Sequence, residues 1–437
     1  MRKKEINIGI VGFGTVGSGV VKVLRDSAVM LKEKTAAKFI VKRVVDIDIK
    51  RRRGVNVSPA LFSSNIKDIL EDKDIQVVVE LTGSESVAMK LMMDAMSRGK
   101  HVVTANKAVL AKNWNRLFAA ARKNKVGLYF EASVGAGIPV IQVIREGMAA
   151  NRISQIFGIV NGTTNYVLSR MRKDGWSFSQ ALNDAAKKGF AEPDPSLDIG
   201  GFDSMHKLIV LSSLAFGKAV DIKDVYVEGI DRVDATDVSY GEEFGYMLKL
   251  LAIAKENGGK IEARVHPTFL PREHLLSSVE DEYNAIYIVG DLTGPIVLYG
   301  KGAGQMSAAS AVVADLMEIG QNSIGGCGNE TTGLWEEKRK DLKILDIKDI
   351  RSKYYLRFSV IDSSGVLAKI SNILGRNNIS IAKVIQKEER KKSVVPVVMM
   401  THIATERNVL RALSLIGRLG IIKAKTVLIR VEDGAGF

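Results

Sequence analysis

The fold of the first part of the chain is decided by the stretch Ile6-Asn7-Ile8-Gly9-Ile10-Val11-Gly12-Phe13-Gly14-Thr15-Val16-Gly17. A β-branched run leads straight into Gly-x-Gly-x-x-Gly, and a helical pattern follows from Ser18 to Leu31. In such a turn the first glycine permits the tight bend, the second lets backbone approach a pyrophosphate, and the third lets helix and strand pack closely. The helix N-terminus attracts the anion. The stretch therefore predicts a nucleotide site rather than a turn needed only for packing.

The alternation of apolar strand and helix continues beyond this turn. Strands are predicted at 39–47, 75–81, 101–104 and 127–132, with helices at 86–98 and 109–123. Continuous apolar strands that alternate with helices are typical of a parallel sheet covered on both faces. The sequence therefore predicts an α/β domain with a Rossmann-type doubly wound sheet over residues 1–132.

Residues 133–330 show a different pattern, in which long helices mix with strands, and they predict an α+β domain for substrate binding and dimerisation. The predicted strands lie at 153–160, 261–269 and 285–291, and the predicted helices at 177–188, 200–215 and 241–256. A glycine segment at 300–304 and a helix at 308–317 are expected to pack back on the first domain.

The end of the chain begins with a charged segment at 331–350, which is interpreted as a solvated linker. Residues 351–437 then predict a compact ferredoxin-like βαββαβ module. Its elements are expected at 354–361, 365–377, 379–387, 393–403, 406–417 and 426–431, with a turn at 388–392.

The basic charge of the chain lies at its two ends. The 63 Lys and Arg residues exceed the 49 Asp and Glu residues, for a net charge of +14. Residues 1–60 carry +9 and residues 351–437 carry +10, whereas residues 61–350 carry −5. A continuous groove for a polyanion is therefore not expected, and we predict a small-molecule substrate and no nucleic-acid partner.

The chain carries the marks of a cytoplasmic protein. The single cysteine, Cys327, cannot form an intramolecular disulfide, which fits a reducing compartment. Met1-Arg2-Lys3 leads directly into a strand without the apolar stretch of a signal peptide. No window of about 20 residues is apolar enough to span a bilayer, so no membrane partner is expected.

The choice between NAD and NADP rests on residues beyond the second strand. Asp46 can accept a hydrogen bond from a ribose 2′-hydroxyl, which favours NAD. Arg51, in the run Lys50-Arg51-Arg52-Arg53, suits a 2′-phosphate and favours NADP, although such a run equally fits a solvated loop. Asp46 favours NAD slightly, and use of both cofactors stays open.

Two lysines are candidates for the chemistry. Lys107 ends the segment Thr104-Ala105-Asn106-Lys107 after a parallel strand, where carboxyl ends of strands face the ligand crevice, although a surface lysine fits equally. Asp203 and Lys207 are spaced i, i+4 on a predicted helix and share a face. They are either a surface ion pair or a lysine held in place as a proton donor.

Several motifs together resemble the homoserine dehydrogenase family. In family order they lie at 12–17, 104–107, 131–139, 161–166 and 192–195, then at Asp198, Asp203 and Lys207, and finally at 302–304. The resemblance covers residues 5–330, and Met306-Ser307 stands where the family has Pro-Thr. The tail resembles an ACT domain through 362–368 and 378–381, so the whole is similar to the monofunctional bacterial form with a C-terminal ACT extension.

The resemblance implies reversible reduction of L-aspartate 4-semialdehyde to L-homoserine by NAD(P)H, in threonine, methionine and isoleucine biosynthesis. It implies that Lys207 is the proton donor, oriented by Asp203, and that Lys107 lies by the nicotinamide and the substrate. It implies substrate binding by Glu192, Asp198, Gly162, Thr163 and Lys107. The implied cofactor-binding residues are Gly12, Phe13, Gly14, Thr15, Val16, Gly17, Asp46, Arg51, Thr82, Thr104, Lys107 and Gly304.

The resemblance also implies a monovalent cation and an effector. Sodium is expected at Glu131 and at the carbonyls of Val134, Ala136 and Ile138, in a segment that also fits a flexible hinge. An amino-acid effector, with threonine expected, is implied at Asp362, Gly365, Val366, Leu367, Asn378 and Ile379. The assembly is expected to be a homodimer or homotetramer.

Two other functions compete with this one. The first is a different amino-acid or hydroxy-acid dehydrogenase on the same scaffold, and the second is a catalytically silent sensor of nucleotide and amino acid. The sensor is disfavoured because Lys107, Lys207 and Glu192 are all present. Turnover of aspartate semialdehyde with NAD(P)H separates the three hypotheses.

Overall fold

The structure is a computed structural model that describes residues 4–48, 54–55, 57–324, 339, 341–387 and 394–433. These residues form two compact units. The first unit comprises residues 1–160, 205–225 and 283–342, and the second comprises 161–204, 226–282 and 343–437. Cys327, the Lys50–Arg53 run and the predicted turn at 388–392 lie outside the described residues.

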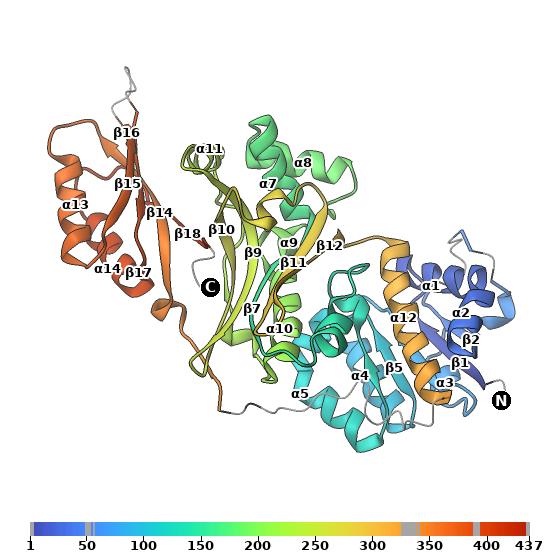
Figure 1. The fold of residues 1–437 in the computed structure, drawn as a ribbon. Helices are drawn as coiled ribbons and strands as arrows, with labels where there is room; N and C mark the ends of the chain where they lie inside the picture. Colours follow the sequence, from blue (N-terminus) through green and yellow to red (C-terminus); the bar gives the residue numbers. More distant parts are fainter. Residues whose placement is uncertain are drawn as a thin grey trace. The chain divides into compact units, whose positions relative to one another are not determined.

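The first unit contains a parallel sheet with the strand order β3-β2-β1-β4-β5-β6, as the doubly wound plan predicts (Figure 1). Its strands are β1 Lys4–Val11, β2 Ala37–Val45, β3 Phe62–Ser63, β4 Val77–Glu80, β5 His101–Thr104 and β6 Leu128–Tyr129. The strand order reverses between β1 and β4. In sheets of this kind ligands bind at that point, outside the carboxyl ends of the strands.

Helices cover this sheet on both faces. Helices α1 (Thr15–Asp26), α2 (Ala28–Thr35) and α12 (Gln305–Ile324) pack together, and α4 (Glu85–Ser97) packs against α5 (Lys107–Asn124) (Figure 1). The predicted helix 18–31 is therefore two helices, which meet at Ser27. Apolar residues of α12, among them Val312 and Leu316, join the buried core of β1 and α1. The short helix α3 (Lys67–Leu70) follows β3.

The first unit also contains an antiparallel set of strands, β12-β11-β7. These are β7 Ile153–Ile159, β11 Tyr283–Gly290 and β12 Gly294–Lys301. The segment between β6 and β7 contains α6 (Val140–Gln142) and the π-helical turn Val143–Gly147. Helix α10 (Phe202–Phe216) supplies most of residues 205–225.

The second unit is built on the long hairpin of β9 (Tyr246–Asn257) and β10 (Lys260–Pro271). The prediction of a helix at 241–256 is wrong, because α11 (Ala235–Glu243) ends before Gly245 and β9 begins at Tyr246. Leu248–Ala254 are buried without alternation, as in a strand covered on both faces. Such an apolar run is ambiguous between helix and strand in sequence, and pairing with β10 along its whole length decides it.

Three further helices of this unit are α7 (Gly162–Asp174), α8 (Phe178–Lys187) and α9 (Ser196–Ile199), and the short strand β8 (Tyr226–Val227) pairs with β10. Within the predicted linker, β13 (Lys343–Ile344) also pairs with β10.

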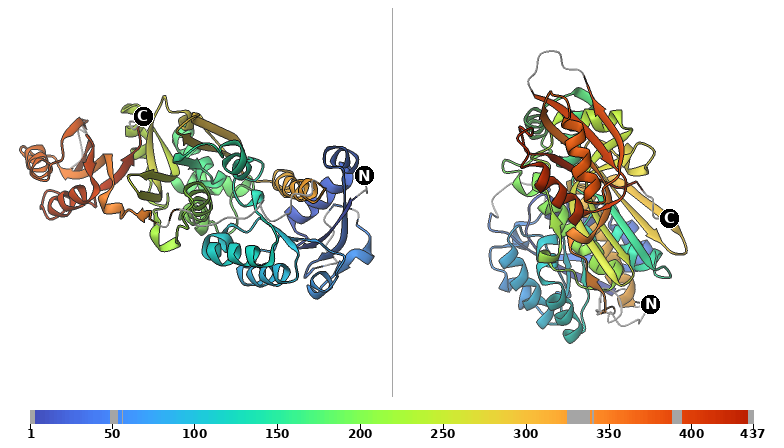
Figure 2. Two further views of the ribbon diagram at one scale, coloured as in Figure 1. Left: turned by 60° about the horizontal axis from the view of Figure 1, so that its bottom comes forward. Right: turned by 90° about the vertical axis from the view of Figure 1, so that its left-hand side faces the viewer.

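The tail forms the predicted βαββαβ module, with the strand order β18-β14-β16-β15. Its elements are β14 Arg351–Ile361, α13 Val366–Arg376, β15 Ile381–Gln386, β16 Val394–Thr401, β17 Ala404–Thr405, α14 Glu406–Ile416 and β18 Val427–Val431. Helices α13 and α14 cover one face of its sheet (Figure 2). Ile370, Leu374, Val409 and Ile416 supply their share of the buried core.

Buried ion pairs join this module to the β9–β10 part of the same unit. Arg357 donates two hydrogen bonds to fully buried Asp237, at 2.6 and 2.9 Å, and the Tyr355 hydroxyl donates a third. Strand β18 pairs in parallel with β10, and Arg264 contacts Glu432 just beyond it. Breaking one partner of a buried pair costs about 3–5 kcal/mol, so the tail contributes to the stability of the unit.

Among the described helices, none is both long and apolar enough to cross a membrane.

Candidate active site

The turn between β1 and α1 has the backbone that a dinucleotide site requires. Gly12 has φ +96°, and a Cβ there would lie 2.5 Å from the Leu81 carbonyl oxygen. A Cβ on Gly17 would collide with the carbonyl of Gly12. A Cβ on Gly14, by contrast, would meet no described atom within 4 Å. The turn is therefore tightly packed at its first and third glycines and open at the second, where a pyrophosphate needs room.

A second helix begins beside this turn. Gln305, the first residue of α12, donates from its side-chain amide to the Ser18 hydroxyl on α1 at 2.9 Å. Gly304 immediately precedes it with φ +121°, and only Ser307 Oγ, at 3.7 Å, lies within 4 Å of a Cβ placed there. The N-termini of α1 and α12 thus lie beside each other, and the positive ends of two helix dipoles favour an anion there.

The predicted cofactor residues differ in which of their atoms face this region. The Phe13 side chain is buried and packs edge-on against Phe62, so it does not face this region. Asp46 accepts hydrogen bonds from Phe13 N at 2.6 Å and from Asp48 N at 2.8 Å, so its carboxylate lies at the glycine turn. Thr15 is exposed and Val16 half-buried. Arg51 lies outside the described residues.

Glu80 is a residue of this site that the sequence interpretation missed. It ends β4, is fully buried, and accepts hydrogen bonds from Thr82 N and Thr82 Oγ1, both at 2.7 Å, and from Thr104 Oγ1 at 2.6 Å. Burial raises the pKa of Glu80, although these hydrogen bonds oppose the shift. One carboxyl group thus holds two predicted cofactor residues together. Its place at the carboxyl end of a predicted parallel strand is the sequence signal that could have identified it.

Lys107 is half-buried and begins α5 directly beyond β5. Thr104 Oγ1 accepts from Asn106 N at 3.0 Å, and Asn106 caps the helix by accepting from Val109 N at 3.2 Å. These two bonds fix the position at which Lys107 leaves the sheet, at the edge where ligands bind.

Lys207 has a buried and ordered ammonium group. The residue is 9% exposed, and its Nζ donates to the Val160 carbonyl at 2.6 Å. Because a buried ammonium is costly unless it is hydrogen-bonded, this bond stabilises the charged side chain in its buried position. Asp203 lies one turn earlier on α10 and accepts from Asn161 Nδ2 at 2.9 Å.

The start of α7 gathers the predicted substrate residues. Asn161 caps the helix by accepting from Thr164 N at 2.9 Å, and its amide nitrogen donates to both Asp198 (2.7 Å) and Asp203 (2.9 Å). Thr163 Oγ1 lies 3.2 Å from Asp198 Oδ2. A Cβ on Gly162 would lie 2.8 Å from the Glu282 carbonyl oxygen. Two carboxylates and two helix-start residues therefore share one network, and Glu192 lies exposed in the loop between α8 and α9.

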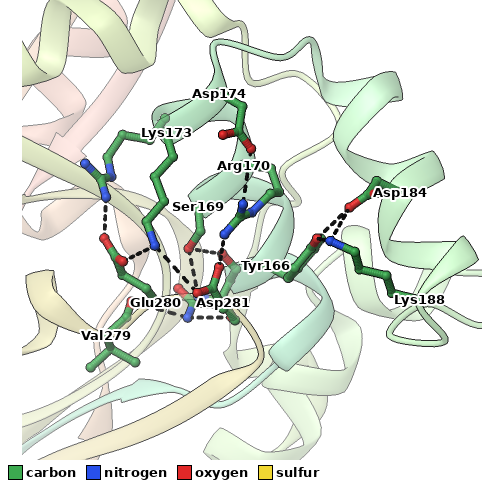
Figure 3. Close-up of polar contacts among 12 residues, drawn as sticks. Tyr166, Ser169, Arg170, Lys173, Asp174, Asp184, Lys188, Val279, Glu280 and Asp281 are labelled. Carbon is green, nitrogen blue, oxygen red and sulfur yellow. Dashed lines mark hydrogen bonds and ion pairs between the residues drawn. The ribbon is translucent and has the colours of Figure 1, made fainter.

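The loop that leads into β11 is held rigidly against α7 (Figure 3). Arg170 donates to Asp281 at 2.5 Å, and Lys173 pairs with Glu280 and Asp281. Asn165 donates to the carbonyls of Val279 and Asp281, at 3.3 and 3.0 Å. Asp281 has the left-handed φ of +55° that these contacts stabilise.

The Glu131 loop has a buried carboxylate and a strained backbone. Glu131 accepts from Ile141 N at 2.9 Å and Gln142 N at 2.8 Å, and burial raises its pKa to about 7 against these bonds. Gly135 and Ala136 both have positive φ, +72° and +44°. Val134 and Ile138 are buried. No cluster of three His, Cys, Asp or Glu side chains suited to a metal occurs in the described part of the chain, so a cation here depends on carbonyl oxygens.

The predicted effector residues divide between surface and core. Asp362, Leu367 and Asn378 are exposed, as is Gly365, whose φ of +80° begins α13. Val366 and Ile379 are buried in the core of the module.

A doubly wound sheet with an open glycine turn at its topological switch point, in a compact unit that also contains the buried Lys207, is typical of a nicotinamide-dinucleotide-dependent oxidoreductase. Comparison with family models supports this class of enzyme and identifies the family within it. "Homoserine dehydrogenase, NAD binding domain" matches residues 12–131, "Homoserine dehydrogenase" matches 139–317, and "ACT domain" matches 354–420. The chain belongs to the homoserine dehydrogenase family.

Relatives cover the chain from end to end. It is 38% identical to the homoserine dehydrogenase of Neisseria gonorrhoeae over 98% of this chain and 99% of the relative. Identity to the Bacillus subtilis homoserine dehydrogenase is 36%, with the same coverage. A crystal structure of a homoserine dehydrogenase from Thiobacillus denitrificans superposes with a TM-score of 0.92 at 40% identity, over 98% of this chain and 99% of that one. A hyperthermophilic archaeal homoserine dehydrogenase in complex with NADPH matches at 26% identity and a TM-score of 0.61, over 72% of this chain and 97% of that one.

Proposed function

We propose that the protein interconverts L-homoserine and L-aspartate 4-semialdehyde with NAD(P), as a step in threonine, methionine and isoleucine biosynthesis. The observation that carries the proposal is the buried Lys207 ammonium, which the Val160 carbonyl holds one turn after Asp203 on α10. Family membership supports the reaction. The domain division 1–132, 133–330, 331–350 and 351–437 belongs to the same proposal.

Lys207 serves as the general acid in the reductive direction. When bound, the reduced nicotinamide supplies hydride to the aldehyde carbon. Negative charge then grows on the aldehyde oxygen, and a fixed ammonium stabilises that charge and donates a proton to it. Lysine is charged at neutral pH, so it is ready as an acid. Asp203, held by Asn161, biases the position of Lys207 on their shared helix.

Acidic residues suit the ammonium group of the substrate. Hydrogen bonds from Asn161 and Thr163 orient Asp198. Exposed Glu192 provides a second negative charge for the substrate ammonium. Gly162 at the start of α7 packs directly against the Glu282 carbonyl, so a side chain at this position would displace the backbone of the site. Lys107, at the start of α5, pairs with the substrate carboxylate or takes part in proton transfer near the nicotinamide.

NAD is the preferred cofactor in this proposal, and NADP is the second. The position of Asp46 at the glycine turn supports NAD, since its carboxylate suits a ribose 2′-hydroxyl. The backbone N–H groups at the starts of α1 and α12 suit the pyrophosphate, and Thr82 and Thr104 lie nearer the nicotinamide end.

The Glu131 loop suits a monovalent cation such as sodium. Its donors are hard oxygens, namely the Glu131 carboxylate and the carbonyls of Val134, Ala136 and Ile138. The left-handed backbone of Ala136, a non-glycine residue, is strain of the kind found at functional sites. Such a cation would hold the chain between β6 and β7 in one conformation.

Regulation, assembly and location complete the proposal. The ACT module senses an amino acid, with threonine the expected effector at the exposed residues near the start of α13. The protein acts in the cytoplasm as a homodimer or homotetramer.

The test is oxidation of NADH and NADPH by the purified protein with L-aspartate 4-semialdehyde, measured with and without threonine. Turnover with either cofactor is the expected result. Tight cofactor binding without turnover would contradict the enzymatic function, and turnover only of another aldehyde or keto acid would contradict the substrate.

A further inference from the structure

We propose that Tyr166, on α7, is a positioning residue that holds the Glu192 loop where Glu192 meets the substrate ammonium group. The inference rests on the proposed function, because it takes Glu192 as a substrate ligand. Tyr166 is 3% exposed, and its hydroxyl group reaches the end of α8, the helix that precedes the Glu192 loop. The proposed reaction gives Tyr166 no part in the chemistry, so its role lies in this contact.

Two charged side chains at the end of α8 hold the hydroxyl group of Tyr166 (Figure 3). The hydroxyl donates to Asp184 Oδ2 at 2.5 Å and accepts from Lys188 Nζ at 2.7 Å. Lys188 Nζ also lies 3.1 Å from Asp184 Oδ2, so the three polar groups contact one another. Hydrogen bonds to charged groups are stronger than bonds between neutral groups. These contacts therefore connect α7 to the residue at which α8 ends.

The two residues that follow Lys188 are also fixed. Gly189 has a φ of +76°, which turns the chain out of the helix. The Phe190 ring packs against the Tyr166 ring, with 4.9 Å between the centroids, and the Phe190 carbonyl accepts from Thr163 Oγ1 at 2.6 Å. Tyr166 thus holds Lys188 through its hydroxyl group and Phe190 through its ring.

The position of Glu192 depends on this segment. Glu192 lies two residues beyond Phe190 and directly before Pro193, and a residue before proline is restricted to extended backbone conformations. On the far side of Pro193, Ser196 N donates to Asp194 Oδ1 at 3.1 Å. The backbone around Glu192 is therefore constrained on both sides. A shift of the segment before it would move its carboxylate away from the substrate ammonium, and small displacements of binding groups are costly in enzymes.

The same segment is joined to the other proposed substrate residues. Thr163 Oγ1, which donates to the Phe190 carbonyl, also lies 3.2 Å from Asp198 Oδ2. Asn161 contacts the same carboxylate at 2.7 Å. Tyr166 therefore acts on the exposed carboxylate of Glu192, whereas Asp198 has its own hydrogen bonds to the start of α7.

Tyr166→Phe tests the inference, because it removes only the hydroxyl group and keeps the ring against Phe190. The KM for aspartate semialdehyde should rise about tenfold, since a charged contact with the substrate is weakened. The value of kcat should change by less than about threefold, and the dissociation constant for NADH should stay the same. Lys188→Met removes one partner of the hydroxyl group and should raise the KM by a smaller factor, because the Lys188 side chain is half exposed.

Tyr226→Phe is the matched control. The Tyr226 hydroxyl donates to Glu228 at 2.9 Å, and Arg430 lies over the Tyr226 ring as Arg170 lies over the ring of Tyr166. Both substitutions remove a hydrogen bond to a carboxylate and should lower the thermal midpoint. Only Tyr166→Phe should raise the KM for aspartate semialdehyde.

A double-mutant cycle shows whether Tyr166 acts through Glu192. Glu192→Gln should itself raise the KM for aspartate semialdehyde, because the negative charge for the substrate ammonium is lost. In a protein that already carries Glu192→Gln, Tyr166→Phe should raise the KM no further, since the carboxylate that it positions is gone. Independent residues would instead give effects that add.

Four results would overturn the inference. An unchanged KM in both Tyr166→Phe and Lys188→Met would limit Tyr166 to stability, and an equal rise in Tyr226→Phe would assign the effect to general destabilisation. Additive effects of Tyr166→Phe and Glu192→Gln would separate the two residues. A fall in kcat at an unchanged KM would assign Tyr166 to the chemical step. If the parent protein did not turn over aspartate semialdehyde, the proposed function would fail together with the inference, whereas any of the four results with normal parent turnover overturns the inference alone.

Discussion

Replacing Lys207 by methionine separates its chemistry from its structural role. Methionine keeps the length of the apolar stem and removes the ammonium that donates to the Val160 carbonyl at 2.6 Å. Loss of this buried hydrogen bond should lower the free energy of unfolding by about 1–3 kcal/mol. Loss of a general acid should lower turnover about 100-fold or more, which corresponds to about 2.7 kcal/mol of transition-state stabilisation.

The assay measures turnover with NADH and aspartate semialdehyde, cofactor binding and thermal unfolding on the same preparations. Lys249→Met is the control, since Lys249 is another buried lysine whose ammonium donates to a main-chain carbonyl, that of Val279. Whatever each substitution does to stability, only loss of Lys207 should reduce turnover, and cofactor binding should persist in both. A folded Lys207→Met protein with turnover within a few-fold of the parent would refute the assignment.

Four other outcomes are expected. Asp46→Asn should raise the KM for NADH about tenfold and that for NADPH less, because a charged acceptor of the ribose hydroxyl is lost; the reverse ranking would make NADP the preferred cofactor. Glu80→Leu should raise the KM for either cofactor about tenfold and change kcat less, because Thr82 and Thr104 lose their shared acceptor; an unaltered KM would limit Glu80 to folding. Burial lowers the pKa of Lys249 from 10.5 to about 8. Between these pH values Lys249 is protonated in the unfolded chain but not in the folded protein, so the free energy of unfolding should rise with pH, by up to about 3 kcal/mol relative to the Lys249→Met protein. Parallel stability curves for the two proteins would show that Lys249 titrates normally. Leu367→Lys should leave basal turnover unchanged and weaken inhibition by threonine about fivefold or more, and undiminished inhibition would place the effector elsewhere.

The regulatory prediction uses a point variant because of what the structure shows about the tail. Removing residues 351–437 would take away Arg357 and Tyr355 from buried Asp237, and Glu432 from buried Arg264. Uncompensated buried charge is strongly destabilising. A truncated chain would therefore test stability before it tested regulation.

The sequence by itself determined the local features of this protein. The spacing of Gly12, Gly14 and Gly17 after a β-branched run allows only a tight strand–turn–helix, so the turn was predictable without a fold. The alternation of apolar strands with helices predicted the parallel sheet, and the tail module followed from the same kind of pattern. The spacing of Asp203 and Lys207 predicted a shared face of a helix, which α10 provides.

Only the tertiary structure decided the features that depend on partners distant in sequence. The apolar pattern at 246–257 is compatible with either a helix or a strand, and pairing with β10 makes this segment the strand β9. Glu80 becomes part of the cofactor region because pairing of β4 with β5 brings the Thr104 hydroxyl to the carboxyl group that Thr82, in the loop after β4, already contacts. Folding likewise buries the amide of Asn284 without supplying a hydrogen-bond partner from the described residues. The periodicity of apolar side chains is a local property that can be read from the sequence. Whether a buried polar group finds a hydrogen-bond partner depends on which distant segments the fold brings together.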